Sequence, residues 1–251
     1  ALIAVHGNEI FSAASAKGVM VAFEASVAGG IPIIKALRER GIPFCNPFNA
    51  KNGSWNPLPA RKDGKVSSAQ RLAAFMRRGE AGQWTKHDLK AWLSGAKCSE
   101  ILPTGGSFKK LEPILAGLDN GELDYGLLTA LVGDSAIEAS MAFDFDWYKR
   151  TLASVRRDSA AYPCAVASRM GTQGLTERPR VVLGTIHSVK GGEAATVILA
   201  PDVSRSGAET WISGPEGQAS IYRLFYVGMT RAWENLYIMR GVSPQLARRL
   251  I

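Results

Sequence analysis

Residues 181–200, VVLGTIHSVKGGEAATVILA, hold a dense polar segment between two apolar runs. The runs lie within Arg180–His187 and Ala195–Pro201 and are rich in β-branched residues, which predicts two strands of a sheet that is buried on both faces. A plain connection between two strands does not need Thr, His, Ser, Lys, two Gly and Glu together. We therefore expect the polar segment to bind a ligand.

A second α/β signal lies near the start of the chain. Gly18–Phe23 is predicted to be a short strand and Ile31–Arg40 a helix, with Pro32 near its first turn and Gly41 past its end. The sequence GIPF then begins a new extended segment. Strand, helix and strand in this order indicate an α/β unit.

The middle of the chain differs in character from both flanks. Residues 45–66 are rich in proline, asparagine and cations, which predicts a loop or linker. From residue 67 to about 170 the pattern is helical, with Ser67 and Thr85 as predicted caps and Asp88 completing a capping box. We therefore divide the chain into an α/β domain, 1–48 with 166–251, and a mainly helical insert, 49–165.

Three further expectations concern local structure. Three tryptophans of the insert lie at core spacing and are predicted to be buried: Trp84, Trp92 and Trp147. Gly207–Gly217 is predicted to be a loop. The segment after it is predicted to be a helix that passes into a final strand, Leu236–Met239.

Composition limits the class of protein. The chain has 251 residues, a formal net charge of +8 and 46% hydrophobic residues, so it can form a packed core. The positive charge favours a polyanionic partner, most often nucleic acid, and a merely solvated basic surface is equally compatible. The cysteines Cys45, Cys98 and Cys164 lack CxxC spacing, which argues against a disulfide scaffold or a structural zinc site.

The same features bear on location. The cysteine usage indicates a reducing compartment, and we expect a cytoplasmic protein. We expect no membrane partner, because an apolar stretch of about 20 residues is missing from the sequence. The chain begins at Ala1 and reaches strand-like sequence early, which suggests a fragment of a longer protein.

The polar segment carries the first group of candidate site residues. Thr185, His187 and Ser188 directly follow the first strand, and the carboxyl ends of parallel strands face the crevice where α/β folds bind ligands. A lone histidine is more often structural than functional. The three polar residues together are hard to explain by packing.

The second half of this segment suits a nucleotide. Gly191 and Gly192 let the backbone turn tightly and approach a ligand. Lys190 supplies a positive charge, and Glu193 supplies an acceptor for a sugar hydroxyl. A glycine pair alone is more often only a turn, so the prediction depends on the combination.

A second motif, YVGMTRA, covers Tyr226–Ala232. In isolation Arg231 reads as a solvated helix arginine. Here an apolar helix, Leu224–Val227, leads straight to it, which can aim its guanidinium at a fixed point. Arginine presents a rigid fork of donors that matches phosphate oxygens.

The two motifs, TIHSVKGGE followed by LFYVGMTRA, closely resemble the fifth and sixth conserved motifs of UvrD/PcrA/Rep-type superfamily 1 DNA helicases. Val19–Phe44 resembles the stretch around the fourth motif of that family. The middle of the chain matches the family only in placement, because the family carries a helical subdomain there. The resemblance implies a RecA-like parallel sheet flanked by helices and formed by both chain ends.

The resemblance also implies roles in ATP binding. Arg231 would be the arginine that reaches the γ-phosphate of ATP, and Glu193 would contact the ribose hydroxyl. Gly191 and Gly192 would shape the turn beside them. An arginine in this role is worth about 10³–10⁵ in rate.

Further roles follow for DNA. Thr185 and His187 would lie where the strand end meets single-stranded DNA, with Ser188 and Lys190 beside them. Three more residues have supporting roles: Tyr226 and Thr230 would position Arg231, and Arg223 would meet a phosphate or an acidic partner.

The sequence departs from the family in two places. The fourth-motif strand runs into Phe23–Ser26, where the family has an arginine, and Gln218–Ser220 stands where the sixth motif begins with acidic residues. The chain also contains no GxxxxGK[ST] phosphate loop and no evident acidic strand end for magnesium. ATP and Mg²⁺ would therefore be bound mainly by a missing N-terminal RecA-like domain.

We interpret the chain as the C-terminal motor half of an ATP-dependent DNA helicase or translocase, inactive as an ATPase without that N-terminal domain. Its DNA partner would be single-stranded or partly duplex, in repair or replication. The alternative is a stand-alone nucleic-acid-binding or regulatory module derived from a motor. The helicase part of a helicase–nuclease is a minor third possibility.

Overall fold

The structure is a computed structural model that describes residues 19–23, 27–45, 65–103 and 105–239. The chain forms two compact units. Unit 1 comprises residues 1–56 and 178–251, and unit 2 comprises residues 57–177. Residues 24–26, Trp55 and most of the predicted linker lie outside the described residues.

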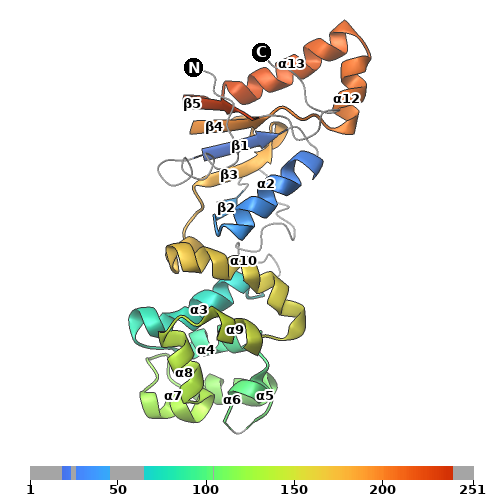
Figure 1. Ribbon diagram of the computed structural model, residues 1–251. Coiled ribbons are helices and arrows are strands. Elements are labelled where there is room, and N and C mark those ends of the chain that lie inside the picture. Colours follow the sequence, from blue (N-terminus) through green and yellow to red (C-terminus); the bar gives the residue numbers. More distant parts are fainter. Residues whose placement is uncertain (1–18, 24–26, 46–64, 104, 240–251) are drawn as a thin grey trace. The chain divides into compact units, whose positions relative to one another are not determined.

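Unit 1 contains a parallel sheet of five strands in the order β2-β3-β1-β4-β5. The strands are β1 (Val19–Phe23), β2 (Phe44–Cys45), β3 (Val181–Thr185), β4 (Ala194–Ala200) and β5 (Ala232–Ile238). Figure 1 shows them side by side, with the early strand β1 between the late strands β3 and β4 and the early strand β2 at the edge beside β3. The prediction of an α/β fold is confirmed, and the two segments distant in sequence share one sheet.

The connection from β3 to β4 is short. Residues 186–193 span it, and they include the 3₁₀ turn η1 (His187–Val189). β1 lies between β3 and β4, and all three strands are parallel. The chain must therefore pass over β1 and run from the carboxyl ends of the strands back to their amino ends. Parallel strands usually need a crossover of a dozen or more residues. The polar segment of the sequence is this crossover.

Unit 1 also contains helices α2 (Val27–Glu39), α12 (Arg205–Ile212) and α13 (Pro215–Met229). A buried apolar cluster joins η1 and α13 to β4, through residues that include Val189, Leu199 and Phe225. Gly228 allows this close packing, because a Cβ there would lie 3.0 Å from Leu199 Cδ1. The core of unit 1 therefore fixes the crossover and α13 relative to the sheet.

Two expectations for this region were wrong. The predicted loop Gly207–Gly217 is largely helical, because α12 runs through it and α13 begins at Pro215. The final strand β5 begins at Ala232, earlier than the predicted Leu236. At the start of the chain, α2 begins at Val27, four residues before the predicted Ile31.

Unit 2 is helical, as the sequence predicts. Its helices are α3 (Ser68–Ala81), α4 (Lys86–Leu93), α5 (Cys98–Ile101), α6 (Phe108–Gly117), α7 (Tyr125–Val132), α8 (Asp134–Met141), α9 (Phe145–Thr151), α10 (Ser154–Met170) and α11 (Gln173–Thr176). Its described residues form two isolated β-bridges and no strand.

An aromatic cluster forms the core of unit 2. Phe75 lies at its centre, with ring centroids 5.3 Å from Trp92 and 5.0 Å from Tyr148. Trp84 and Trp92 are fully buried, which confirms the prediction for both. Trp147 is half-buried and stacks on Phe75 at 5.9 Å. Contacts between aromatic rings at these distances add to the stabilisation from apolar burial.

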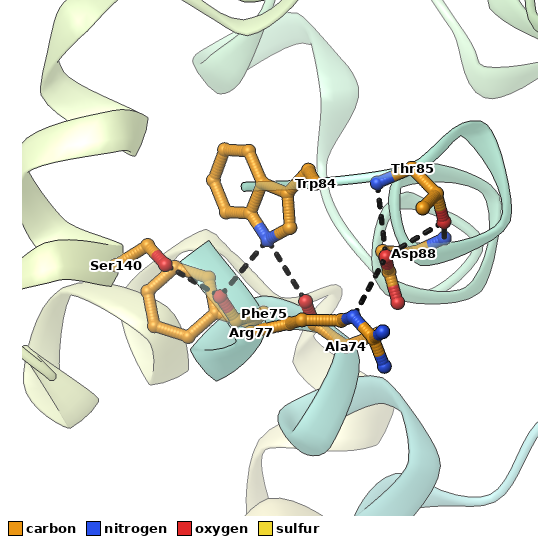
Figure 2. A network of polar contacts seen from close by, with 7 residues as sticks. All are labelled: Ala74, Phe75, Arg77, Trp84, Thr85, Asp88 and Ser140. Atoms are coloured by element: carbon orange, nitrogen blue, oxygen red, sulfur yellow. Dashed lines mark hydrogen bonds and ion pairs between the residues drawn. The ribbon is translucent and has the colours of Figure 1, made fainter. Parts of the chain in front are cut away.

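Polar contacts fix this core to α3 (Figure 2). The indole N–H of Trp84 donates to the carbonyl oxygens of Ala74 and Phe75, at 2.9 and 3.2 Å. The Ser140 hydroxyl donates to the same Phe75 carbonyl. Because these polar atoms are buried, leaving any of them without a partner would cost more than an exposed hydrogen bond contributes.

Helix caps in unit 2 follow the sequence prediction. Ser67 caps α3, and Thr85 caps α4 in a capping box with Asp88. Asp88 also lies 3.5 Å from the guanidinium of Arg77 on α3, so one carboxylate ties two helices together (Figure 2). Across the described part of the chain, every helix is too short or too polar to cross a bilayer.

We predict that Trp84→Phe lowers the free energy of unfolding by about 2 kcal/mol. The substitution keeps an aromatic ring in the core, but it removes the two buried hydrogen bonds of the indole N–H and leaves unfilled volume. Chemical denaturation followed by circular dichroism measures this change. Trp233→Phe is the control, since Trp233 is 70% exposed. Equal effects of the two substitutions would contradict the account of this core.

Candidate functional site

The first site element is the turn at the carboxyl end of β3. The Thr185 hydroxyl accepts from the backbone N–H of Ser188 at 3.0 Å, and the Ser188 hydroxyl donates to the Thr185 carbonyl at 3.0 Å. These reciprocal bonds join each hydroxyl to the backbone of the other residue. Thr185 and Ser188 therefore act first as a structural clamp that starts the crossover.

Within the crossover, the 3₁₀ turn and the residue after it carry two exposed side chains. His187 and Lys190 are exposed, and the Lys190 N–H donates to the His187 carbonyl at 3.4 Å. The turn closes with a bond from the Gly192 N–H to the Val189 carbonyl at 2.9 Å. Gly191 has φ +88°, a conformation that strongly favours glycine.

A pocket of about 380 Å³ lies beside the crossover, between η1, α12 and α13. It brings together three cationic or titratable side chains, from His187, Lys190 and Arg223, and three hydroxyls. The remaining lining comes from Gly207 and from apolar residues of the crossover and α13. The lining residues are Ile186, His187, Lys190, Ser206, Gly207, Thr210, Ser220, Ile221, Arg223, Leu224 and Val227, and none is acidic.

This composition suits an anion. Ammonium and guanidinium groups bind phosphate through charge-assisted hydrogen bonds, and hydroxyls add neutral donors. Ser206 and Gly207 belong to the first turn of α12, whose positive dipole end favours negative charge, and the Gly207 N–H is already bonded to the Ser204 hydroxyl at 2.9 Å. Sequence analysis missed the α12 residues because the segment reads as a glycine-rich loop.

Arg231 lies at the end of α13 and is half-buried. Its Nε donates to the Val227 carbonyl at 3.0 Å and its Nη2 to the Thr230 hydroxyl at 3.2 Å. Thr230 in turn donates to Val227 at 3.1 Å. These bonds satisfy a carbonyl at the helix terminus and orient the guanidinium, whose other N–H groups can still bind a ligand.

Tyr226 contacts this segment through its backbone. Its carbonyl accepts from the Thr230 N–H at 3.0 Å, while its side chain is 64% exposed. The contact that positions the end of α13 is thus made by the backbone of Tyr226, and its ring faces solvent.

Glu193 and Arg231 are brought together by the sheet. The Ala194 N–H donates to the Arg231 carbonyl at 3.0 Å, which joins the starts of β4 and β5. Glu193 is exposed, and its Oε2 accepts from the indole N–H of Trp233 at 2.7 Å. Trp233 directly follows the second motif, but no sequence pattern marks it as a site residue.

The predicted site residues therefore form two groups. Thr185 is level with Ala200 at the carboxyl edge of the sheet, whereas Glu193 precedes Ala194 at the amino edge. The length of β4, about 20 Å at ~3.3 Å per residue, separates the two edges. Thr185 thus lies at the carboxyl ends of the strands, where the sequence placed it, whereas Glu193 and Arg231 lie at their amino ends.

The cysteines belong to neither group. Burial raises the pKa of the Cys164 thiol to about 12 and also raises the pKa of Cys98. Burial raises the pKa of Cys45 as well, against an opposing effect of Arg178. These thiols are protonated at neutral pH and are poor nucleophiles. No cluster of three or more metal-ligating side chains occurs within the described ranges.

Comparison with known proteins identifies one domain. Residues 165–241 match the family of UvrD-like helicase C-terminal domains. The match includes β3, β4, β5, the crossover and α13, and so contains both motifs. It does not reach Val19–Phe44, so the resemblance of that stretch to the fourth motif stays a prediction.

Two curated enzymes share a short segment with the chain. Homoserine dehydrogenase of Pseudomonas aeruginosa is 80% identical over 39 residues, and that of Neisseria gonorrhoeae is 68% identical over 38 residues. These segments make up 16% and 15% of this chain. The matched part of this chain covers about 9% of the length of each enzyme. A segment this short is smaller than a domain and carries no argument for dehydrogenase activity.

The two glycines of the crossover give a matched test. We predict that Gly191→Ala lowers the free energy of unfolding by about 1–2 kcal/mol, because alanine is strained at positive φ. Gly192 is not among the described glycines with positive φ, so Gly192→Ala is expected to cost less. Urea denaturation of both variants measures the difference, and a larger loss for Gly192→Ala would contradict the described turn.

Proposed function

Since residues 165–241 form a UvrD-like helicase C-terminal region, we propose that the chain is the C-terminal motor half of an ATP-dependent DNA helicase or translocase. In this proposal unit 1 is a second RecA-like motor domain, and unit 2 is its inserted helical subdomain. The observation that carries the proposal is that Glu193 and Arg231 directly precede the register partners Ala194 and Ala232, at the amino edge of the sheet.

The amino edge suits half of a nucleotide site. Arg231 offers a guanidinium already oriented by Val227 and Thr230, and Glu193 offers a carboxylate to a ribose hydroxyl. A guanidinium stabilises the charge that develops on a phosphoryl group during transfer. The phosphate loop, the Mg²⁺ ligands and the acid that positions water belong, in this proposal, to an N-terminal RecA-like domain. Mg²⁺ would neutralise phosphate charge there.

The other site is the pocket beside the crossover, which suits a phosphodiester of single-stranded DNA. Lys190 and Arg223 supply positive charge, and His187 supplies a ring nitrogen. Most contacts of proteins with nucleic acids go to phosphate and sugar, and these contacts fix position without reading sequence. The net charge of +8 adds a general attraction for DNA.

The crossover would connect the two functions. It begins at the Thr185–Ser188 clamp and ends at Glu193, so one short segment touches both edges. Loss of the γ-phosphate contact would shift Arg231 and, through its backbone bond to Ala194, the start of β4. The crossover would transmit this shift to the residues that contact DNA. Closing and reopening the cleft between two such domains would move them along single-stranded DNA.

A stand-alone nucleic-acid-binding module is the second candidate. The pocket favours it, because its lining residues all come from this chain, whereas the nucleotide site is only half formed. The two candidates differ in ATP hydrolysis, which only the motor requires.

We predict that Lys190→Ala with Arg223→Ala weakens binding to single-stranded DNA and lowers the slope of log K against log salt by about 1.4, the value for two lost phosphate contacts. Fluorescence anisotropy with a labelled oligothymidine at several salt concentrations measures both. Lys109→Ala on α6, also exposed, is the control. An unchanged slope in the double variant would contradict the assignment of the pocket to DNA.

For the nucleotide edge, we predict that Arg231→Ala reduces DNA-stimulated ATP hydrolysis by about 10³–10⁵-fold in the protein extended upstream of Ala1. Arg231→Lys should recover only part of the rate, since lysine lacks the planar fork. Arg169→Ala in α10, an exposed arginine of unit 2, should leave the rate unchanged. Full activity of Arg231→Ala would refute the motor assignment.

A further inference from the structure

We propose that Trp233 and Glu193 together form a nucleoside-binding pair, in which the carboxylate binds the ribose and the indole stacks on the base. This inference rests on the proposed function and adds the recognition of the base to it. Trp233 is then both a contact residue and the residue that positions Glu193.

Trp233 is more exposed than the other tryptophans that the structure describes. Its side chain is 70% exposed at the start of β5, whereas Trp84 and Trp92 of unit 2 are fully buried. Its indole N–H donates to Glu193 Oε2 at 2.7 Å. The polar edge of the ring is therefore fixed while the ring itself faces solvent. An exposed indole offers a large, flat apolar surface for an aromatic ligand.

The chemistry of a nucleoside matches this pair. A purine base is bonded directly to a ribose, so its receptor needs an aromatic surface and a hydroxyl acceptor side by side. The indole of Trp233 and the carboxylate of Glu193 are in hydrogen-bond contact, which meets that requirement. Arg231 lies two residues before Trp233 in the chain and would supply a guanidinium to the phosphates of the same ligand.

The hydrogen bond also orients the carboxylate. Glu193 is exposed, and among the described residues its carboxylate forms no ion pair that would hold it. The indole N–H uses one lone pair of Oε2 and restricts the side-chain rotation, which leaves Oε1 free to accept from a ribose hydroxyl. Pre-orientation of this kind reduces the entropy lost when the ligand binds.

The test is equilibrium binding of this chain to ATP and to inorganic tripolyphosphate, which has neither base nor ribose. We expect Trp233→Ala to weaken ATP binding about tenfold or more, the effect of one lost stacking surface, and to leave tripolyphosphate binding unchanged. Trp233→Phe keeps a stacking ring without the N–H, so it should weaken ATP binding less. Tyr125→Ala, another exposed aromatic, is the control.

A second readout separates stacking from a merely structural role. Because purines stack more strongly than pyrimidines, Trp233→Ala should also lower the preference for ATP over CTP, which a loss of local structure would not do. Quenching of tryptophan fluorescence by ATP should likewise be smaller in Trp233→Phe.

The outcomes distinguish this inference from the proposed function. If Arg231→Ala and Glu193→Gln weaken ATP binding and Trp233→Ala does not, the pair is wrong and the nucleotide half-site stands. If Trp233→Ala weakens ATP and tripolyphosphate equally, the tryptophan supports the fold or a protein contact and not the base. If the chain does not bind ATP at millimolar concentration, both the inference and the nucleotide half-site fail.

Discussion

The crossover from β3 to β4 is the constraint on which the rest of unit 1 depends. Residues 186–193 must carry the chain past β1 and back along the full length of β4. That displacement is about 20 Å along the strands and ~10 Å across them. Nine Cα–Cα steps reach about 30 Å when fully extended, and the 3₁₀ turn rises only ~2 Å per residue. The connection is thus almost taut.

This tautness explains the residues of the polar segment. The Thr185–Ser188 bonds start the turn without help from neighbouring elements, and Gly191 takes a positive φ that redirects the chain toward β4. The apolar side of the crossover, at Ile186 and Val189, is buried against α13 and β4. Its polar residues are left at the surface, some at each edge of the sheet. A polar sequence between two buried strands is what this path requires.

The end of α13 is likewise fixed by a few hydrogen bonds. Arg231 satisfies the Val227 carbonyl at the helix terminus, and its own carbonyl accepts from Ala194. A side chain held in this way loses little rotational freedom when it meets a phosphate. The backbone bond also places Glu193 and Trp233 beside it. One helix end, one strand start and one edge of the sheet are fixed together by a few hydrogen bonds.

The sequence predicted those features that depend on local chemistry. The β-branched runs became β3 and β4, and the Thr85 capping box formed as predicted. The failure at Gly207–Gly217 has a physical cause. Pro215 begins α13, and Gly217 is needed because a Cβ there would lie 1.9 Å from the Thr210 carbonyl oxygen. That glycine serves helix packing, a tertiary requirement that resembles a turn signal in sequence.

The arrangement of the site was beyond local reasoning. Glu193 and Thr185 are eight positions apart in sequence, and their places at opposite edges follow from the insertion of β1 between β3 and β4. That strand order comes from a segment more than 150 residues earlier in the chain. Trp233 was overlooked for a similar reason, since only the pairing of β4 with β5 brings it to Glu193.

The most direct test of the proposal is whether a ligand bound at one edge of the sheet changes the affinity for a ligand at the other edge. The affinity of the upstream-extended protein for single-stranded DNA is measured with and without a non-hydrolysable ATP analogue, and its affinity for the analogue with and without DNA. The account predicts that each ligand changes the affinity of the other by the same factor, about 5–150-fold. Equal DNA affinities in the presence and absence of bound nucleotide would contradict it.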